Sequence, residues 1–253
     1  MTLIVCDIAG TTVNEDGIVY RQLRECVERR GVSVTAAQVN AVKGTEKRSA
    51  IATLLGGAGE ADGTGDAGNV DDAVVDAVFA DFMEGLRREY ASHPPRPIDG
   101  VEEALSRLRE DGAGIVLTTG FQRPIADIVL AACGWSVRDR ARDAAQDAGD
   151  AGASGFVVDA LVTSDTVAAG RPAPYLIHHA MEITGVTSVD DVVSVGDTVA
   201  DLRAAANAGV RGVGVLTGSV DRAVLAAEPH ALILDSLADI PALHEVPATR
   251  RAD

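Results

Sequence analysis

The sequence predicts an α/β protein: a doubly wound, Rossmann-like parallel sheet with an inserted all-helical cap domain. Short, continuous apolar runs recur along the chain, as is typical of strands buried on both faces in parallel sheets. Amphipathic helical patterns alternate with these runs over about residues 98–240, which predicts right-handed crossovers between parallel strands. Residues 18–92 show only helical periodicity, so we expect them to form a separate insert.

Each predicted strand is an apolar run bounded by turn-forming residues. These runs are Leu3–Cys6, Gly114–Leu117, Phe156–Val162, Val192–Val195 and the weaker Val213–Leu216 and Ala231–Leu234. Each predicted helix of the core has apolar residues at three- and four-residue spacing. These helices are Val101–Glu110, Pro124–Ala132, Pro172–Ile183 and Val199–Ala208. The helices expected in the insert are Val19–Arg29, Ala36–Val42, Glu46–Leu55 and Asp72–Tyr90.

Two short connections delimit the insert. Asn14–Gly17 is a cluster of turn-forming residues, and His93–Pro97 contains three prolines and cannot continue a helix. We therefore expect a core of residues 1–15 plus 96–253, a cap of residues 16–95, and a hinge between them. Residues 56–68 are rich in Gly, and residues 138–155 are rich in Ala, Asp and Gly. Both compositions are typical of surface loops.

Composition excludes several classes of protein. The 253 residues include 22 Lys and Arg against 38 Asp and Glu, a formal charge of −16, which disfavours nucleic acid and anionic membranes as partners. Apolar residues make up 47% of the chain, enough for a sizeable core. Three dispersed cysteines form neither a disulfide framework nor a zinc site. No membrane helix or signal peptide is evident, so we expect a cytoplasmic protein.

Polar residues gather where four of the predicted strands end. In open parallel sheets, ligands bind at the carboxyl ends of the strands. The four groups, in chain order, are Asp7, Thr118-Thr119-Gly120, Gly170-Arg171-Pro172 and Gly196-Asp197-Thr198-Val199-Ala200-Asp201. Taken singly, each has a simpler interpretation as a turn, cap or solvated loop residue. Because all four groups follow successive strands and so lie at one edge of the sheet, we predict that they form a single site.

The carboxylates of this edge favour phosphoryl chemistry with a metal ion. Asp7, Asp197 and Asp201 come from different strand ends and can hold Mg²⁺, which prefers oxygen ligands. With that charge balanced, one carboxylate can attack phosphorus and form an aspartyl-phosphate. Asp7 is the predicted nucleophile, because we expect the turn Gly10-Thr11-Thr12 to leave it exposed at the tip of the first strand.

The remaining groups are suited to binding the phosphoryl oxygens. Thr118 and Thr119 offer hydroxyls beside backbone N–H groups, including that of Gly120, and Arg171 can neutralise one oxygen. We therefore assign phosphate binding to these four residues and a catalytic role to Thr118 and Arg171. Asp165, just before the third group, is either close to the metal site or a turn residue.

These four motifs resemble those of the haloacid dehalogenase (HAD) superfamily of hydrolases, over nearly the whole chain. The chain is most similar to its phosphonoacetaldehyde hydrolase (phosphonatase)-like subfamily, on the form Asp7-Ile8-Ala9-Gly10-Thr11-Thr12 and the phrase Ala168-Ala169-Gly170-Arg171-Pro172. The resemblance implies a Mg²⁺-dependent hydrolase with a HAD core and a helical cap. The substrate of such an enzyme would be a small phosphonate or phosphate. The resemblance also allows a homodimer formed through the first cap helices.

The resemblance gives Ala9 and Lys47 particular meaning. Phosphatases of the superfamily carry a second Asp where this chain has Ala9. Ala9 offers the metal only its backbone carbonyl. Hydrolysis of a phosphate ester would therefore lack its general acid, which typically contributes about 10²–10⁴-fold to the rate. C–P cleavage needs an electron sink instead, which the family obtains from a cap lysine in a Gly-x-x-Lys motif. Gly44-Thr45-Glu46-Lys47 corresponds to it, so Lys47 is the predicted Schiff-base residue. The alternative is a solvated helix lysine flanked by Glu46 and Arg48.

The chain departs from the subfamily pattern at several positions, so more than one substrate is compatible with the sequence. This chain has Lys43, Ala50, Gly17 and Phe121 where phosphonatases usually have Met, His, Cys and Tyr. The main alternative is a phosphatase of a small phosphate monoester, similar to phosphoglycolate phosphatase. A phospho-accepting receiver domain is disfavoured, because receivers lack a long helical insert. A silent binding protein is disfavoured because Asp7, Arg171, Asp197 and Asp201 are all present.

Overall fold

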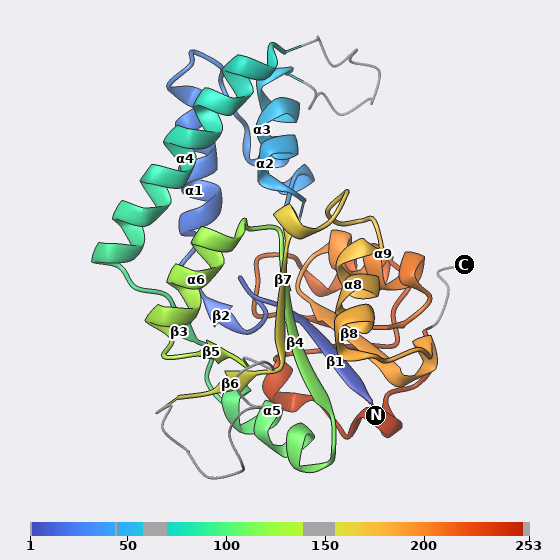
Figure 1. The fold of residues 1–253 in the computed structure, drawn as a ribbon. Coiled ribbons are helices and arrows are strands. Elements are labelled where there is room, and N and C mark those ends of the chain that lie inside the picture. Colours follow the sequence, from blue (N-terminus) through green and yellow to red (C-terminus); the bar gives the residue numbers. More distant parts are fainter. Residues whose placement is uncertain (1, 44, 58–69, 139–154, 250–253) are drawn as a thin grey trace.

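The computed structural model describes residues 2–43, 45–57, 70–138 and 155–249. Its core is a six-stranded sheet of order β10-β9-β8-β1-β4-β7 in which all neighbours are parallel. Its strands are β1 (Leu3–Asp7), β4 (Gly114–Thr119), β7 (Ala160–Thr163), β8 (Val192–Gly196), β9 (Arg211–Val215) and β10 (Leu232–Leu234). The first strand is central and the order reverses around it, so the predicted doubly wound fold is confirmed (Figure 1).

Helices cover both faces of this sheet. They are α5 (Val101–Glu110), α6 (Arg123–Ala132), α8 (Tyr175–Thr184), α9 (Val199–Ala208) and α10 (Arg222–Ala226). Side chains alternate across the strands, so Ile4 of β1 packs in one apolar cluster with Leu105 and Ile125 of α5 and α6. Val5 packs in a second cluster with Leu176 of α8. Both faces of β1 are therefore buried, as its continuous apolar sequence predicts.

The predicted strand Phe156–Val162 is wrong in one respect, because it is divided in two. Residues Val157–Val158 form β6, which pairs with β5 (Ser136–Val137), and β7 begins only at Ala160. The intervening Asp159 accepts a hydrogen bond from Ile115 N at 2.7 Å and forms an ion pair with Arg138 at 2.6 Å. This carboxylate needs polar partners, so the chain leaves the sheet ladder at that residue.

The predicted helix Pro172–Ile183 starts three residues later than expected, at Tyr175. Pro172 and Pro174 have no backbone N–H, and Ala173 N donates to Gly170 O in a tight turn. The peptide bond between Arg171 and Pro172 is cis. The segment before α8 is therefore a turn, and Arg171 lies on it rather than on a helix.

In its described residues, the inserted segment above the sheet contains four helices (Figure 1). They are α1 (Ile18–Glu28), α2 (Ala36–Ala41), α3 (Lys47–Leu55) and α4 (Asp72–Ser92). Leu23 of α1, Ile51 of α3 and Phe82 of α4 are at most 1% exposed and belong to the same buried cluster. The insert thus has an apolar interior of its own that is continuous with one face of the core.

The two connections to the insert pair with each other. Val13–Asn14 forms β2 and Arg96–Pro97 forms β3, and these short strands are antiparallel. The sequence analysis treats 93–97 only as a stiff linker and does not predict this pairing, which depends on residues more than eighty positions apart. After β2, Asp16 and Gly17 both have positive φ, at 52° and 70°, and turn the chain into α1.

Four short 3₁₀ turns complete the described elements: η1 (Ser164–Thr166), η2 (Val189–Asp191), η3 (Leu237–Asp239) and η4 (Leu243–Glu245). The predicted loops 56–68 and 138–155 fall almost entirely outside the described residues, as does Gly44. Within the portions that the structure does describe, we find no helix with the length and apolar character that a membrane crossing requires.

Candidate active site

The register of the sheet brings the four predicted groups to one edge. Asp7, the last residue of β1, pairs with Thr118 of β4, and Cys6 pairs with Val195 of β8. The residues that follow β8, Asp197 onward, therefore begin level with Asp7. The turn after η1 adds Arg171 from the far side of β4. Four segments that are distant in sequence thus contribute to one pocket, as predicted.

Three carboxylates form the centre of the site. Asp7, Asp197 and Asp201 are 5–7% exposed, and their oxygens lie within 4.8 Å of one another. Mg²⁺ prefers oxygen ligands of this kind, so the three carboxylates could hold this ion. The guanidinium of Arg171 pairs with Asp7 and Asp201, and a divalent cation would add further positive charge to this acidic cluster.

Glycines make room for the Asp197 carboxylate. A Cβ atom built on Gly218 would lie 1.8 Å from Asp197 Oδ2, and one on Gly10 would lie 2.7 Å from the same oxygen. Gly10 also has a φ of +88°, which side-chain-bearing residues rarely adopt. Thr11 Oγ1 donates to Asp197 Oδ1 at 3.1 Å. One oxygen of Asp197 is thus fixed by a hydroxyl, and the other lies against two backbone segments that only glycine permits.

Arg171 links two of the carboxylates to Thr118. Its Nη1 atom lies 2.6 Å from Asp7 Oδ1 and 2.7 Å from Asp201 Oδ1, and its Nη2 atom donates to Thr118 Oγ1 at 3.0 Å. Burial alone would lower the pKa of Arg171, but Asp201 and Asp7 raise it above its usual value. The guanidinium therefore stays charged and holds Asp7 in a fixed orientation.

Asp7 itself is buried, contrary to the expectation of an exposed strand tip; its exposed fraction is 7%. The turn after β1 folds back on the strand instead, because Thr12 Oγ1 donates to Asp7 O at 3.0 Å and Val13 N donates to Ile8 O at 2.8 Å. Burial raises the pKa of Asp7 to about 6, while Arg171 acts in the opposite direction. Burial also raises the pKa of Asp197 well above its usual value.

Thr118 and Thr119, which end β4, and Gly120, which follows it, occupy different positions. Thr118 reaches Arg171, as described, whereas Thr119 Oγ1 accepts a hydrogen bond from Phe121 N at 3.1 Å and fixes the turn. Gly120 faces the insert: a Cβ atom there would lie 3.1 Å from Thr45 O. Gly170 is similar, since its Cβ would lie 3.0 Å from Glu46 Cβ. Two motif glycines of the core therefore allow the loop before α3 to approach the site.

Lys47 is buried in the site and is not a solvated helix lysine. It is the first residue of α3 and only 5% exposed. Its Nζ atom donates to Thr45 O at 2.9 Å and lies 5.3 Å and 6.0 Å from the ring centroids of Tyr20 and Phe121. The neighbouring Arg48 points away, forming ion pairs with Asp72 and Asp76. Adjacent charged residues thus have opposite environments, which local sequence does not reveal.

The pKa of Lys47 is lowered to about 8, first by burial and further by Arg171, while Asp7, Glu46 and Glu15 act to raise it. About one lysine in ten is then neutral at pH 7. Lys47 is therefore more nucleophilic at neutral pH than an ordinary lysine.

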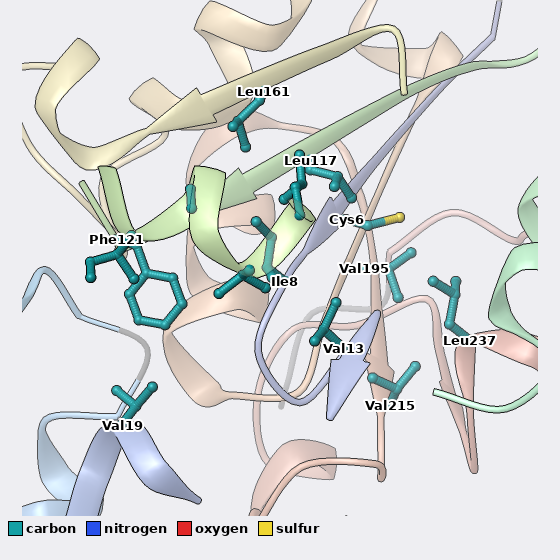
Figure 2. Close-up of a cluster of buried hydrophobic side chains, with 14 of the residues drawn as sticks. Cys6, Ile8, Val13, Val19, Leu117, Phe121, Leu161, Val195, Val215 and Leu237 are labelled. Carbon is teal, nitrogen blue, oxygen red and sulfur yellow. The ribbon is translucent and has the colours of Figure 1, made fainter. Parts of the chain in front are cut away.

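The reacting groups enclose a small cavity of about 20 Å³. Its lining residues come from both the core and the insert: Asp7, Ala9, Val19, Tyr20, Lys47, Thr119, Gly120, Phe121, Arg171 and Thr198. Figure 2 shows the ring of Phe121, from the core, directed toward Val19 of α1. The cavity holds no more than about one water molecule.

Two residues near Lys47 were not identified from the sequence. Tyr20 lies on the amphipathic pattern of α1, which gives no local signal of function, yet its ring faces both Lys47 and Lys43. Glu15 is 9% exposed, and its Oε2 atom accepts a hydrogen bond from Val19 N at 2.8 Å. Burial raises the pKa of Glu15 to about 7. An acidic residue in a turn cluster is ordinarily solvated, so only the fold indicates this environment.

Among the positions that depart from phosphonatases, Phe121 lines the small cavity. Lys43 donates a hydrogen bond to Ser219 Oγ of the core. Ala50 is buried within α3. Asp165, whose role the sequence leaves open, accepts a hydrogen bond from Arg123 N at 3.2 Å and is exposed. It belongs to the turn before Arg171 and is not among the three clustered carboxylates.

Comparison with known proteins agrees with this arrangement. The model of the haloacid dehalogenase-like hydrolase family matches residues 1–209. The chain belongs to this family, whose members share the parallel core found here.

Within the family, the chain is similar to phosphonoacetaldehyde hydrolases. It is 35% identical over 195 residues to that enzyme of Parabacteroides distasonis, covering 68% of this chain and 66% of the relative. For the Bacillus cereus enzyme the identity is 32% over 227 residues, covering 85% and 76%. For the Bacteroides fragilis enzyme it is 36% over 155 residues, covering 61% of this chain and 51% of the relative. The chain thus spans between about half and three quarters of these relatives.

Solved structures show the same fold. A phosphonoacetaldehyde hydrolase-like protein from Oleispira antarctica has a TM-score of 0.71 at 21% identity, covering 94% of this chain and 89% of that one. A hydrolase from Pseudomonas syringae has a TM-score of 0.74 at 18% identity, covering 94% and 95%. At these identities the likeness concerns the fold alone.

Proposed function

We propose that this protein hydrolyses the C–P bond of a small phosphonate of the phosphonoacetaldehyde kind. The observation that carries the proposal is the position of Lys47, whose side chain is buried and lines one cavity with Asp7. Ala9 lines that cavity too, so the position that supplies a general acid in phosphatases has none. The cavity therefore has a carboxylate for attack on phosphorus and an amine, but no general acid to protonate a leaving group. This set of groups suits a leaving group that takes up the electron pair of the broken bond without being protonated.

The first step is condensation at Lys47. Its neutral amine attacks the aldehyde carbon, water leaves, and a protonated imine forms. Burial keeps a useful fraction of this amine neutral, since it lowers the pKa of Lys47 to about 8. The rings of Tyr20 and Phe121 lie close enough to attract the cationic imine. The carbon next to phosphorus now has an electron sink.

The second step is phosphoryl transfer. An oxygen of Asp7 attacks phosphorus, the C–P bond breaks, and its electron pair moves into the imine to give a neutral enamine and an aspartyl-phosphate. Arg171 and Thr118 neutralise and orient the phosphoryl oxygens. Mg²⁺ bound by Asp7, Asp197, Asp201 and the Ala9 carbonyl would supply further positive charge against those oxygens.

Two hydrolyses then restore the protein. The enamine takes a proton on carbon, and water releases acetaldehyde and the free Lys47 amine. A second water attacks the aspartyl-phosphate and releases phosphate. Because water leaves in the first step, the overall reaction consumes one water for each phosphonate cleaved.

The test is borohydride reduction in the presence of phosphonoacetaldehyde. We expect mass spectrometry to find one stable adduct on Lys47, and we expect Lys47→Arg to lose at least about 10³-fold in kcat/KM. Arg48→Lys is the matched control, because Arg48 forms only surface ion pairs. Vigorous hydrolysis of small phosphate esters, equal in wild type and Lys47→Arg, would instead identify a phosphatase.

Two further predictions accompany this proposal. A homodimer through the first cap helices and a cytoplasmic location are expected on the sequence resemblance and composition. Sedimentation velocity of the purified protein, with and without Mg²⁺, tests the first. A sedimentation coefficient of a 26.1 kDa monomer at all concentrations would contradict it.

A further inference from the structure

A second, larger cleft opens beside the reacting groups. Its volume is about 520 Å³, and it lies between α3 of the insert and the core segment from η1 to Arg171. Arg171 lines both this cleft and the small cavity that contains Asp7 and Lys47. Any group attached to a phosphorus atom held at Arg171 can therefore extend into the cleft.

The cleft is much larger than the proposed aldehyde needs. A two-carbon aldehyde has three non-hydrogen atoms, and at roughly 30 Å³ for each water-sized group it occupies about 90 Å³. The cleft exceeds this several-fold. A longer substituent on the leaving carbon can therefore enter it.

The walls of the cleft are acidic. Glu46 accepts hydrogen bonds from Arg48 N and Ser49 N at the start of α3, and Asp165 accepts one from Arg123 N at the start of α6. Both helix N-termini are thus already neutralised by carboxylates. Among the described lining residues, Arg171 at the floor is the single cation. An anionic substituent would consequently be repelled by this cleft.

One wall residue has an unused hydroxyl. Ser164 is 8% exposed, and its Oγ atom has no hydrogen-bond partner among the described residues. Its backbone is fixed, because Ser164 N donates to Phe121 O at 3.0 Å. In the described rotamer this Oγ atom has almost no accessible surface, so a ligand reaches it only after the side chain rotates about χ1. A buried hydroxyl without a partner costs stability, and pairing with a ligand would offset that cost. Gln122, with an amide side chain, lines the same wall.

We infer that this cleft is a subsite for the leaving group, and that it selects phosphonates or phosphates with an ammonium or hydroxyl substituent over those with a second acid. The inference rests on the proposed function only in placing phosphorus at Asp7 and Arg171. Ser164 and Gln122 hydrogen-bond the substituent, and Asp165 and Glu46 attract its positive charge.

A different cleft includes positively charged side chains in its lining. It has a volume of about 410 Å³, lies on the other side of the loop before α3, and is lined by Lys43 and Arg203. Arg203 is already paired with Glu228 at 2.6 Å and 2.8 Å, which leaves Lys43 as its main cation. A carboxylate substituent would enter this second cleft instead, so substituent charge discriminates between the two.

The test uses three phosphonates that lack an aldehyde and so bind without reacting. They are 3-aminopropylphosphonate, 3-hydroxypropylphosphonate and 2-carboxyethylphosphonate, with propylphosphonate as the reference, titrated calorimetrically in Mg²⁺ buffer. We expect the amino compound to bind about tenfold more tightly than the reference and the carboxy compound about tenfold more weakly. Because no bond is broken, this order is independent of whether the protein cleaves C–P bonds.

Two variants locate the effect. Asp165→Asn should remove most of the advantage of the amino compound, whereas Asp127→Asn, an exposed carboxylate on α6 that pairs with Arg123 outside the cleft, should not. Ser164→Ala should weaken the hydroxy compound several-fold and leave the reference unchanged.

Three outcomes would overturn the inference. Equal affinity for all four compounds, or no binding at millimolar concentration, would mean that the cleft does not distinguish phosphonates by their substituent. Tightest binding of the carboxy compound, abolished by Lys43→Met, would place the substituent in the second cleft. Conversely, absence of any hydrolysis together with the expected binding order would refute the proposed reaction and leave the subsite standing.

Discussion

The ammonium nitrogen of Lys47 lies 5.3 Å from the centre of the Tyr20 ring, and the two residues come from different helices of the insert. Both line the small cavity that contains Asp7. Folding of the cap therefore determines the surroundings of this amine, whereas folding of the core determines the carboxylates that face it. The packing of the cap against the core brings Lys47 and Asp7 to one cavity, so the properties of the two groups are separable by mutation.

The pH dependence of C–P cleavage should follow the Lys47 amine. Only the neutral amine condenses with an aldehyde, and burial lowers its pKa to about 8 from 10.5. We expect kcat/KM to rise with pH through about 8 and to level off above it. A pH–rate profile from 6.5 to 9.5 measures this. A flat or falling profile over that range would contradict a role for this amine as nucleophile.

Replacement of Tyr20 should move that profile. The ring attracts the ammonium form by about 0.5–2 kcal/mol, so Tyr20→Leu removes a stabilisation of the charged state. We expect the rising limb to shift to lower pH by roughly half to one pH unit. Tyr20→Phe, which retains the ring, is the control and should leave the limb in place. The same shift in both variants would assign the effect to the hydroxyl.

Removal of the buried amine should stabilise the fold while it abolishes activity. The pKa of Lys47 is lower in the folded state than in the unfolded chain. Its charge therefore opposes folding below pH 8, and stability rises as pH increases from about 8 to 10.5. We expect Lys47→Met to raise the free energy of unfolding by about 1–3 kcal/mol at pH 7. Urea unfolding at pH 7 and pH 10 measures this, and the gain should shrink at the higher pH.

The metal affinity should depend on Gly218. A Cβ atom there would lie 1.8 Å from Asp197 Oδ2, so Gly218→Ala must displace this carboxylate. We expect at least about tenfold weaker Mg²⁺ binding, in line with the effect of disturbing groups that orient metal ligands. Gly31→Ala is the control: it is strained by a φ of +82° but meets nothing within 4 Å. If both variants bind Mg²⁺ like the wild type, Asp197 is not a ligand.

Ala9→Asp should restore phosphatase chemistry. Ala9 lines the cavity with Asp7, at the position where related phosphatases supply their general acid. We expect hydrolysis of an alkyl phosphate ester to rise by about 10²-fold, at the lower end of the range for such groups. Ala9→Asn has a similar shape but no acid, and should show no gain. Comparable activity of the two variants would mean that the leaving group is protonated elsewhere.

Much of the fold could be read from local patterns. β1 and β4 are continuous apolar runs because both of their faces are buried, and the helices of the core begin and end close to where their periodicity does. The exceptions have local physical causes that are visible only with their partners. Asp159 divides a predicted strand because its carboxylate binds the backbone of β4. Pro172 and Pro174 delay α8 because neither has an N–H to donate.

The sequence by itself determined which groups could carry phosphoryl chemistry, because parallel strands bring their carboxyl ends to one edge whatever else the chain does. Asp7, Thr118, Arg171, Asp197 and Asp201 meet there as a consequence of topology and register. Only the tertiary structure decided which of two neighbouring cations, Lys47 or Arg48, lies in the dry interior and which in water. Solvation of a side chain depends on packing between the cap and the core, and adjacent residues on one helix can differ in it completely.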